Sequence, residues 1–329
     1  MESSAVPHRW SPLLKATAGR VPVALLAIAA LGTAGSPLGI WSSHIERMSH
    51  FRWWWLGLLV ALASWFFRKQ RRALAAIAAA LTAWAAIPLG PYWISHPKVA
   101  SENALKFLAW NVLWENPTKD LALPWLGHQE ADVLLLTECT DEWRQRLSPL
   151  KEKYPFQISS GRDGAEGMWL LSRYPLDVPD ADGIAADKPW ISTLMHAPGG
   201  PVRILGMHPR TPRAGQRFDQ RNQQYDHAAD IAANAGTPVV LLGDLNCTPF
   251  SPWFQRLLKR GKLHDSALGF GLPSTWHSNG IGLPIDHILV SSDWQVVERK
   301  VHPDWMGSDH RPVIAVLALS SSPDRNDKQ

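Results

Sequence analysis

The hydrophobic and polar positions divide the chain into two parts with different periodicities. Three long apolar stretches follow one another near the N-terminus, at 21–40, 51–67 and 73–93. A helix needs roughly 20 apolar residues to cross a bilayer, and the first and third stretches have that length. Trp53 lies at the start of the shorter second stretch, and Trp is favoured at the membrane interface. We therefore expect about three transmembrane helices, which form an anchor at 21–93 after a short cytoplasmic segment at 1–20.

After a linker at 94–102 the pattern changes to short runs of β-favouring apolar residues. The runs cover 105–110, 131–137, 167–176, 202–208, 239–242, 284–290 and 313–319. Three helical stretches, 120–127, 216–234 and 252–260, interrupt them, and strands that alternate with helices are typical of an α/β (α+β) domain. We place this domain at 103–319 and expect the polar tail at 320–329 to be disordered.

Polar residues occur where most of these runs end. In chain order they are Asn111, Glu138, His208, Asp244, Asn246, Asp286, Asp309 and His310. In an α/β sheet, the carboxyl ends of the strands border the crevice where such folds bind ligands. One polar residue after a strand is ordinary, but a series of this length indicates a functional site.

The stretch Val239–Asn246 shows this arrangement most clearly. Four apolar residues predict a buried strand, Gly243 allows the backbone to turn, and Asp244 and Asn246 follow. The carboxylate can bind a metal or accept a proton, while the amide can hydrogen-bond a phosphoryl oxygen without adding charge. An Asp/Asn turn after a strand is the structural alternative.

Charge is distributed unevenly along the chain. Residues 1–100 hold ten Lys/Arg and two Asp/Glu, a net charge of +8, which leaves 23 basic and 27 acidic residues and a net charge of −4 for 101–329. Non-specific binding to nucleic acid depends on cationic groups that release counterions, so nucleic acid is a less favoured partner. Cys139 and Cys247 are the only cysteines, and the sequence leaves open whether they pair.

The basic residues also predict an orientation in the membrane. The cluster Arg68–Arg72 lies between the second and third stretches and is cytoplasmic by the positive-inside rule. Three spans then carry the domain at 103–319 to the periplasmic or extracellular side of the cell inner (plasma) membrane. Two alternatives stay open: the first stretch is a cleaved signal peptide, or the third does not insert and the domain stays in the cytoplasm.

Six short motifs resemble the signatures of the endonuclease/exonuclease/phosphatase superfamily, which has the fold of deoxyribonuclease I. They are Ala109-Trp110-Asn111, Thr137-Glu138, Gly206-Met207-His208, Gly243-Asp244-Leu245-Asn246, Ile285 to Ser291, and Ser308-Asp309-His310-Arg311-Pro312. The resemblance implies a four-layer α/β/β/α sandwich with two mixed β-sheets. With its apolar N-terminal third, the chain is similar to the membrane-bound VanJ-type teicoplanin-resistance proteins and the YafD-type proteins. That likeness implies dephosphorylation of undecaprenyl pyrophosphate on the outer face of the membrane.

Phosphoester hydrolysis needs charge neutralised on the phosphoryl group and a water aligned for attack. We expect Glu138, completed by Asn111 and Asp309, to bind Mg²⁺ or Mn²⁺, because hard cations prefer oxygen ligands. Asp244 is expected to orient and deprotonate the attacking water, and Asn246 to hold that water or a phosphoryl oxygen.

Two histidines and an arginine complete the expected site. His310, paired with Asp286, is expected to contact the phosphate as an imidazolium. His208 is expected to be a second phosphate-binding or proton-transferring imidazole, and Arg210 to grip the substrate bidentately. The structural alternatives are a turn residue for Asn111, a surface carboxylate for Glu138, a packing residue for His208, and a solvated helix face for the run of arginines that begins at Arg210.

These observations favour a membrane-anchored, divalent-metal-dependent phosphoesterase acting on a phosphorylated lipid, with no obligate protein partner. Three alternatives stay open: an exported metal-dependent nuclease, a sphingomyelinase-like phospholipid phosphodiesterase, and a non-catalytic membrane protein that binds phosphorylated ligands. The acidic balance of 101–329 weighs against the nuclease, and a missing ligand position would favour the non-catalytic protein.

Overall fold

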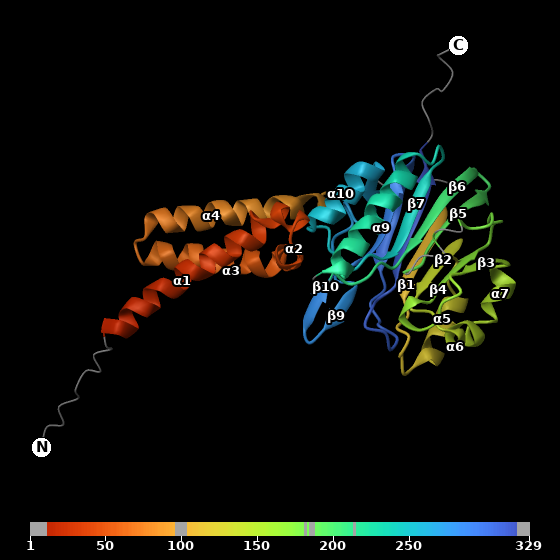
Figure 1. Ribbon diagram of the computed structural model, residues 1–329, viewed down its shortest axis with the longest axis horizontal. Helices are drawn as coiled ribbons and strands as arrows, with labels where there is room; N and C mark the ends of the chain where they lie inside the picture. Colours follow the sequence, from red (N-terminus) through yellow and green to blue (C-terminus); the bar gives the residue numbers. More distant parts are fainter. Residues whose placement is uncertain (1–11, 96–103, 181–182, 184–187, 213–214, 321–329) are drawn as a thin grey trace, which may run out of the picture. The chain divides into compact units, whose positions relative to one another are not determined.

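The computed structural model describes residues 12–95, 104–180, 183, 188–212 and 215–320 (Figure 1). The chain divides into two compact units, Met1–Leu89 and Gly90–Gln329. Most of the predicted N-terminal segment, linker and tail lies outside the described residues, and these expectations stay predictions.

The first unit is helical. It contains α1 (Pro12–Thr33), α2 (Ser43–Ser49), α3 (Arg52–Arg68) and α4 (Arg72–Ala86), with short 3-10 turns η1 (Ser36–Ile40) and η2 (Ile87–Tyr92). Among the described residues one helix, Arg72–Tyr92, is long and apolar enough to cross a membrane, a test that buried core helices also pass; Arg20–Thr33 is apolar but shorter. The predicted stretch 21–40 is not one helix, because α1 ends at Thr33 and η1 begins a new turn with a proline in its first positions.

The second unit contains two mixed β-sheets, as the family resemblance implies. The six-stranded sheet has the order β12-β13-β1-β2-β4-β3, and only β1 and β2 run parallel. Its strands are β1 (Leu105–Asn111), β2 (Val133–Thr137), β3 (Phe156–Ser159), β4 (Met168–Ser172), β12 (Trp294–Val301) and β13 (Val313–Leu319).

The five-stranded sheet has the order β5-β6-β7-β11-β8, and only β6 and β7 run parallel. Its strands are β5 (Trp190–Ala197), β6 (Gly200–Met207), β7 (Val239–Asp244), β8 (Leu263–Asp265) and β11 (Asp286–Ser291). A separate hairpin consists of β9 (Trp276–Ser278) and β10 (Ile281–Leu283).

Alternation of side chains along the strands produces the layers. In β2, Leu135 faces the core between the sheets, whereas Leu134 and Leu136 face a second core beneath the helices on the outer side. In β7, Leu242 and Leu241 divide in the same way between the central core and a third core. Both strands are buried on both faces, which explains their continuous apolar sequences.

The helices lie outside the two sheets. They are α5 (Ala122–Gly127), α6 (Asp141–Arg146) and α7 (Leu150–Lys153) beside the six-stranded sheet, and α9 (Gln216–Ala233) and α10 (Pro252–Gly261) beside the five-stranded sheet. The order of layers is therefore helix, sheet, sheet, helix. Cys139 and Cys247 are both buried, and Cys247 Sγ accepts a hydrogen bond from the Tyr225 hydroxyl at 2.9 Å.

One glycine fixes the end of β7. Gly243 has a φ of +138°, and a Cβ at this position would lie 2.0 Å from the Met207 carbonyl oxygen of β6. Only glycine fits both the conformation and the close approach of the two strands. Asp244, the next residue, pairs with Asp286 at the start of β11, which places two carboxylates at one edge of the sheet.

Candidate active site

The site lies where β1, β2, β6 and β7 end, and two of its residues have a left-handed backbone. Glu138 follows β2 with a φ of +55°, and Asn246 lies just after β7 with a φ of +52°. Such conformations are costly for residues other than glycine and cluster at functional sites. One follows a strand of the six-stranded sheet and the other a strand of the five-stranded sheet. This arrangement indicates a site whose side-chain directions are set by the fold.

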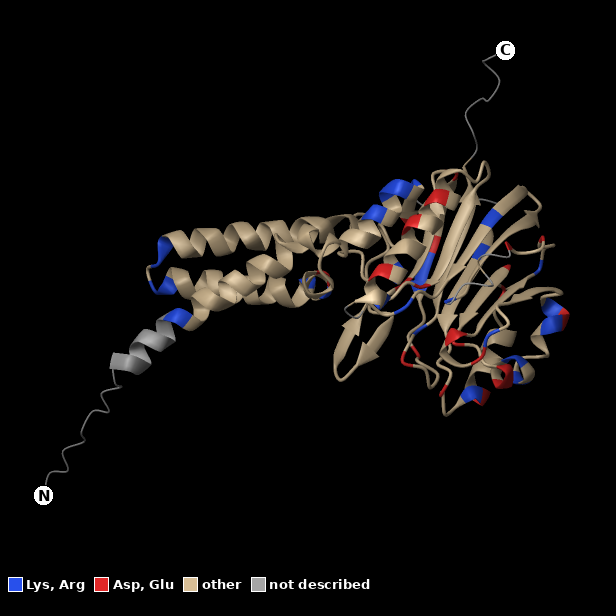
Figure 2. Ribbon diagram, viewed as in Figure 1, with Lys and Arg blue, Asp and Glu red and all other residues tan. Residues whose placement is uncertain are grey.

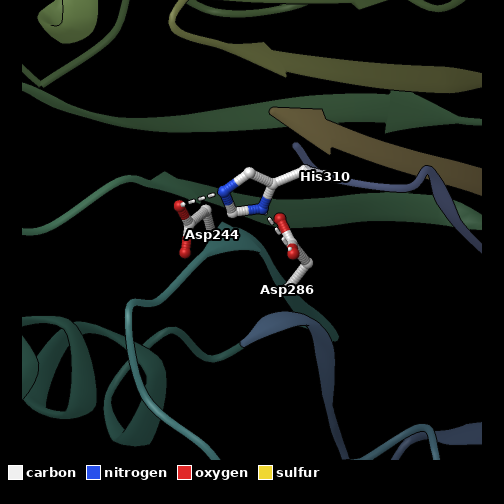
Figure 3. Close-up of side chains that lie close together, drawn as sticks. All are labelled: Asp244, Asp286 and His310. Atoms are coloured by element: carbon white, nitrogen blue, oxygen red, sulfur yellow. Dashed lines mark hydrogen bonds and ion pairs between the residues drawn. The ribbon is translucent and has the colours of Figure 1, made fainter. Parts of the chain in front are cut away.

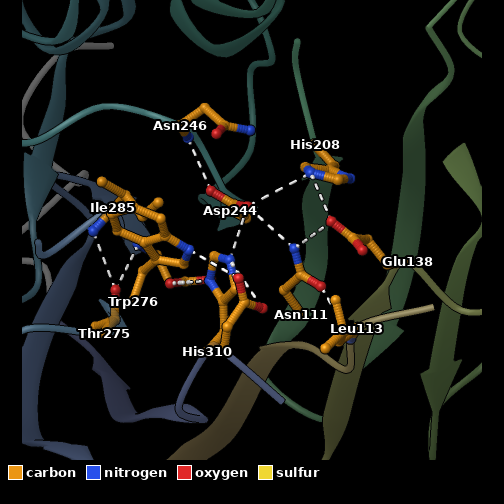
Figure 4. Close-up of polar contacts among 12 residues, drawn as sticks. Asn111, Leu113, Glu138, His208, Asp244, Asn246, Thr275, Trp276, Ile285 and His310 are labelled. Carbon is orange, nitrogen blue, oxygen red and sulfur yellow. Dashed lines mark hydrogen bonds and ion pairs between the residues drawn. The ribbon is translucent and has the colours of Figure 1, made fainter. Parts of the chain in front are cut away.

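Asn111 connects the two sheets. Its Nδ2 donates to Glu138 Oε1 at 2.9 Å and to Asp244 Oδ2 at 3.1 Å (Figure 4). Its Oδ1 accepts a hydrogen bond from the Leu113 backbone N–H at 3.1 Å, which fixes the amide in this orientation. A turn residue would not explain a 1% exposed amide between two carboxylates.

His310 bridges two carboxylates from neighbouring strands (Figure 3). Its Nδ1 lies 2.8 Å from Asp286 Oδ2 and its Nε2 lies 3.6 Å from Asp244 Oδ2. Thr275 Oγ1 accepts the backbone N–H of Asp286, which fixes the start of β11. The pairing of His310 with Asp286 that the sequence predicts is present in the structure.

The charged forms of His310 and Asp244 are favoured despite burial, whereas burial raises the pKa of Asp286. Burial alone would lower the pKa of His310, but Asp286 and Asp244 raise it to about 10, so the ring is an imidazolium at neutral pH. Burial would raise the pKa of Asp244, but His310 and His208 together hold it below its ordinary value. One imidazolium between two carboxylates keeps the buried charges paired.

His208 follows β6 and faces the same carboxylates. Its Nε2 lies 3.4 Å from Asp244 Oδ2 and 3.8 Å from Glu138 Oε1. Its Nδ1 lies 3.5 Å from the ammonium of Lys188, a buried residue that the sequence analysis missed. Burial lowers the pKa of Lys188, and no periodicity or motif around it indicates proximity to the site.

The remaining predicted residues lie at the margin. Asn246 donates from its backbone N–H to Asp244 Oδ1 at 2.8 Å and from Nδ2 to the Pro209 carbonyl at 3.0 Å. Asp309 accepts from the Trp276 indole at 2.9 Å and is 39% exposed. Arg210 lies 3.4 Å from Glu166 and only partly faces solvent.

The arginines after Arg210 do not form one basic surface. Arg221 is fully buried, with its guanidinium 5.5 Å from the Phe218 ring centroid and 5.0 Å from that of Tyr225. Arg213 lies outside the described residues. Arg221 is therefore not part of a solvated helix face. Because it is buried, it is also not available to bind a phosphate.

Several side chains of the site have atoms that can bind a divalent cation. Within the described residues, the potential ligand atoms of Asp244, Asp286 and His310 lie within 4.8 Å of one another. This cluster differs from the expected ligand set of Glu138, Asn111 and Asp309. An imidazolium has no free lone pair for a metal. In this group the positive charge of protonated His310 therefore opposes the negative charge of the carboxylates. Within the expected set, Glu138 and Asn111 are in contact, and their side-chain oxygens are of the kind that Mg²⁺ prefers.

The arrangement combines the groups that hydrolysis of a phosphoester requires. It offers ionised Asp244 beside a histidine proton donor, an oxygen-rich site at Glu138, and the uncharged amide of Asn246. Together these groups can orient a water, accept its proton and stabilise negative charge on a phosphoryl oxygen.

Comparison with known proteins identifies relatives at the level of the family and the fold. The model of the Endonuclease/Exonuclease/phosphatase family matches residues 108–310. No curated protein matches the chain.

Three solved structures share the fold. TDP2 from D. rerio, complexed with a single-strand DNA product, has a TM-score of 0.56 at 14% identity. The match covers 66% of this chain and 100% of the TDP2 chain. The 3' phosphatase NExo from Neisseria, bound to a product DNA hairpin, has a TM-score of 0.54 at 20% identity with the same coverage. An endonuclease/exonuclease/phosphatase from Beutenbergia cavernae has a TM-score of 0.51 at 20% identity, with 66% of this chain covering 72% of that one.

Proposed function

Because the chain belongs to the endonuclease/exonuclease/phosphatase family, we propose that it is a metal-dependent phosphoesterase that acts at a membrane on a phosphorylated lipid. The specific substrate we propose is undecaprenyl pyrophosphate. The observation that carries the catalytic part is the bridge of His310 between Asp286 and Asp244, next to the Glu138–Asn111 pair. No position of the expected constellation lacks a suitable side chain.

The chain's own residues account for the chemical step. Asp244 is ionised, accepts a hydrogen bond from the attacking water and takes its proton as the water oxygen bonds to the terminal phosphorus. The bond from that phosphorus to the bridging oxygen breaks in the same step, so inorganic phosphate forms and undecaprenyl phosphate leaves. His310 donates from Nε2 toward a phosphoryl oxygen, and Asp286 holds the ring in the charged form. Asn246 and His208 flank Asp244 and restrict where the water and the phosphoryl group lie.

Mg²⁺ or Mn²⁺ is the proposed cofactor, held by Glu138 with Asn111 and Asp309. When bound, it neutralises charge on the phosphoryl group. In the orientation described, Asn111 presents its nitrogen to Glu138, so its oxygen can bind a cation only after the amide rotates.

The membrane part of the proposal rests on the helical unit. Arg72–Tyr92 has the length and composition of a spanning helix, and exposed apolar side chains such as Ile77 and Trp84 lie along it. Figure 2 shows Lys and Arg gathered at the turn between α3 and α4, formed by Arg68, Lys69, Arg71 and Arg72. We propose that this turn is cytoplasmic, that about three helices span the membrane, and that the catalytic unit lies on the periplasmic or extracellular side.

Phosphate release by the full-length protein in detergent tests the substrate. With Mg²⁺, we expect release from undecaprenyl pyrophosphate and no nicking of a DNA duplex. Glu138→Gln should abolish release, and Glu142→Gln, at an exposed carboxylate that pairs with Arg146, is the matched control and should retain it. If DNA is nicked and the lipid stays intact, the substrate is nucleic acid and the lipid hypothesis is wrong. If neither is hydrolysed, the remaining hypothesis is a non-catalytic protein that binds phosphorylated ligands.

A further inference from the structure

The second unit begins with a short segment that lies before the region matched by the family. In this segment the Gly269 N–H donates to the Pro91 carbonyl at 3.0 Å, and the Gly271 N–H donates to the Tyr92 carbonyl at 2.7 Å. The ring of Trp93 packs over Gly271, where an added Cβ would lie 3.4 Å from it. The segment therefore pairs with the loop that follows β8 and is part of the folded catalytic unit.

Tyr92 also reaches into the interior of this unit. Its hydroxyl donates to Asp265 Oδ2 at 3.2 Å, and Asp265 is 2% exposed. The other carboxylate oxygen, Oδ1, accepts the Ala267 N–H at 2.9 Å. Asp265 pairs in register with Leu289 of β11, the strand that begins with Asp286. Tyr92 thus supplies a hydrogen bond to a buried carboxylate on the strand next to β11.

Two buried titratable side chains, His287 and Arg299, act on Asp265. His287 Nδ1 lies 3.9 Å from Asp265 Oδ2, and His287 is the neighbour of Asp286 in β11. Arg299 is 5% exposed, and its Nε and Nη1 have no hydrogen-bond partner among the described residues. Burial lowers the pKa of Arg299, while the carboxylates of Asp265 and Asp286 oppose this shift. Asp265 and Asp286 therefore both favour the charged form of Arg299.

The loop after Asp265 provides a second connection to Asp286. It runs from Ser266 to Ser274 and ends at Thr275, whose hydroxyl oxygen accepts the N–H groups of Ile285 and Asp286, each at 3.0 Å. The loop is thus held at Asp265, at Gly269 and Gly271 by the segment that contains Tyr92, and at Thr275.

We propose that Tyr92 is a positioning residue for the His310–Asp286 pair, acting through Asp265 and the loop from Ser266 to Thr275. This proposal rests on the proposed function for its kinetic consequence. It assigns the end of the apolar helix Arg72–Tyr92 a role in aligning the active site as well as in attachment. A catalytic domain cut within 94–102 lacks this residue.

Tyr92→Phe in the full-length protein tests the proposal, because it removes one hydroxyl and little volume. Tyr154→Phe is the matched control: Tyr154 is also fully buried in this unit and its hydroxyl donates to the Gln129 carbonyl at 3.3 Å, away from Asp286. We expect Tyr92→Phe to lower kcat at least about fivefold with KM within about twofold, and Tyr154→Phe to change kcat less than about twofold at equal folded fraction. Equal effects of the two variants, or an unchanged kcat in Tyr92→Phe, would overturn the proposal.

A spectroscopic measurement separates this proposal from the proposed function. The proton between His310 Nδ1 and Asp286 gives a far-downfield proton NMR signal, identified by its loss in His310→Gln. We expect this signal to shift or broaden in Tyr92→Phe and to stay unchanged in Tyr154→Phe. A wild-type protein without turnover would refute the proposed function, and the NMR comparison would still decide the role of Tyr92. A variant signal identical to that of the wild type would refute that role, and Asp265→Asn repeats the test if Tyr92→Phe does not fold.

Discussion

His310 Nδ1 lies 2.8 Å from Asp286 Oδ2, and both side chains are almost completely buried. A buried ion pair is stable only when its geometry is good and the remaining polar atoms are satisfied. Here the second ring nitrogen faces Asp244 Oδ2 at 3.6 Å, whereas Asp286 Oδ1 has no hydrogen-bond partner among the described residues. The proposed catalytic role and the stability of the second unit therefore both involve His310.

Replacement of Asp286 should move the pH dependence of activity. Asp286 is a main cause of the raised pKa of His310, about 10, so the active imidazolium of the wild-type enzyme persists into alkaline solution. In Asp286→Asn we expect the alkaline limb of kcat to move toward neutral pH and kcat at pH 8 to fall about 10²-fold or more. A pH–rate profile of both proteins measures this, and an unmoved alkaline limb would refute the assignment.

The stability of the second unit should fall as pH rises from about 6.5 to about 10. His310 has an ordinary pKa of 6.5 when unfolded and about 10 when folded, so across this range the folded state binds the extra proton. The stabilisation is complete below the lower value and lost above the upper one. Melting temperatures should show this decline, and His310→Gln should flatten it. His196→Gln, at a half-exposed histidine, is the control and should leave the slope in place.

Asn111→Asp should make folding depend on divalent cations. The substitution replaces the amide donor between Glu138 and Asp244 with a third carboxylate, which creates repulsion that a dication relieves. We expect a lower melting temperature that Mg²⁺ largely restores. Asn116→Asp is the control, because Asn116 donates to the Val112 and Met306 carbonyls and its loss should not respond to Mg²⁺. Equal rescue of both variants would contradict a cation site at Glu138.

Gly243→Ala should cost more stability than an alanine at another positive-φ glycine. At Gly243 the new Cβ would lie 2.0 Å from the Met207 carbonyl oxygen, whereas at Gly236, with a φ of +65°, it meets nothing within 4 Å. We expect a loss of more than about 3 kcal/mol for Gly243→Ala and about 1 kcal/mol for Gly236→Ala, by chemical denaturation. Similar losses would mean that β6 and β7 separate without penalty.

The central strands could be predicted from the sequence because they are buried on both faces. The runs that contain β1, β2, β7 and β13 are continuous apolar segments, and each boundary agrees within about two residues. The four edge strands of the two sheets, β3, β5, β8 and β12, were missed, as were the hairpin strands β9 and β10. The edge strands contain polar residues such as Ser192 and Glu298, and an edge strand needs fewer apolar side chains.

The sequence could predict that several of the expected site residues lie together, but not the contacts that they make. Residues that follow strands gather at one edge, so the position of Glu138, His208 and Asp244 follows from the pattern. The left-handed backbone of Glu138 and the burial of Lys188 beside His208 depend on tertiary packing, and neither residue type signals them. The sequence also could not predict that the Asn111 nitrogen donates to Glu138 and Asp244, because an amide can present either its oxygen or its nitrogen.

Turnover by Asp244→Asn tests the central claim most directly, because Asp244 contacts Asn111, His208 and His310 at once. The measurement is kcat for phosphate release from undecaprenyl pyrophosphate by full-length wild-type and variant proteins with Mg²⁺, at matched folded fraction. The account predicts a loss of at least about 10³-fold with the fold intact. A folded Asp244→Asn protein with turnover near that of the wild type would contradict it and place the chemistry elsewhere.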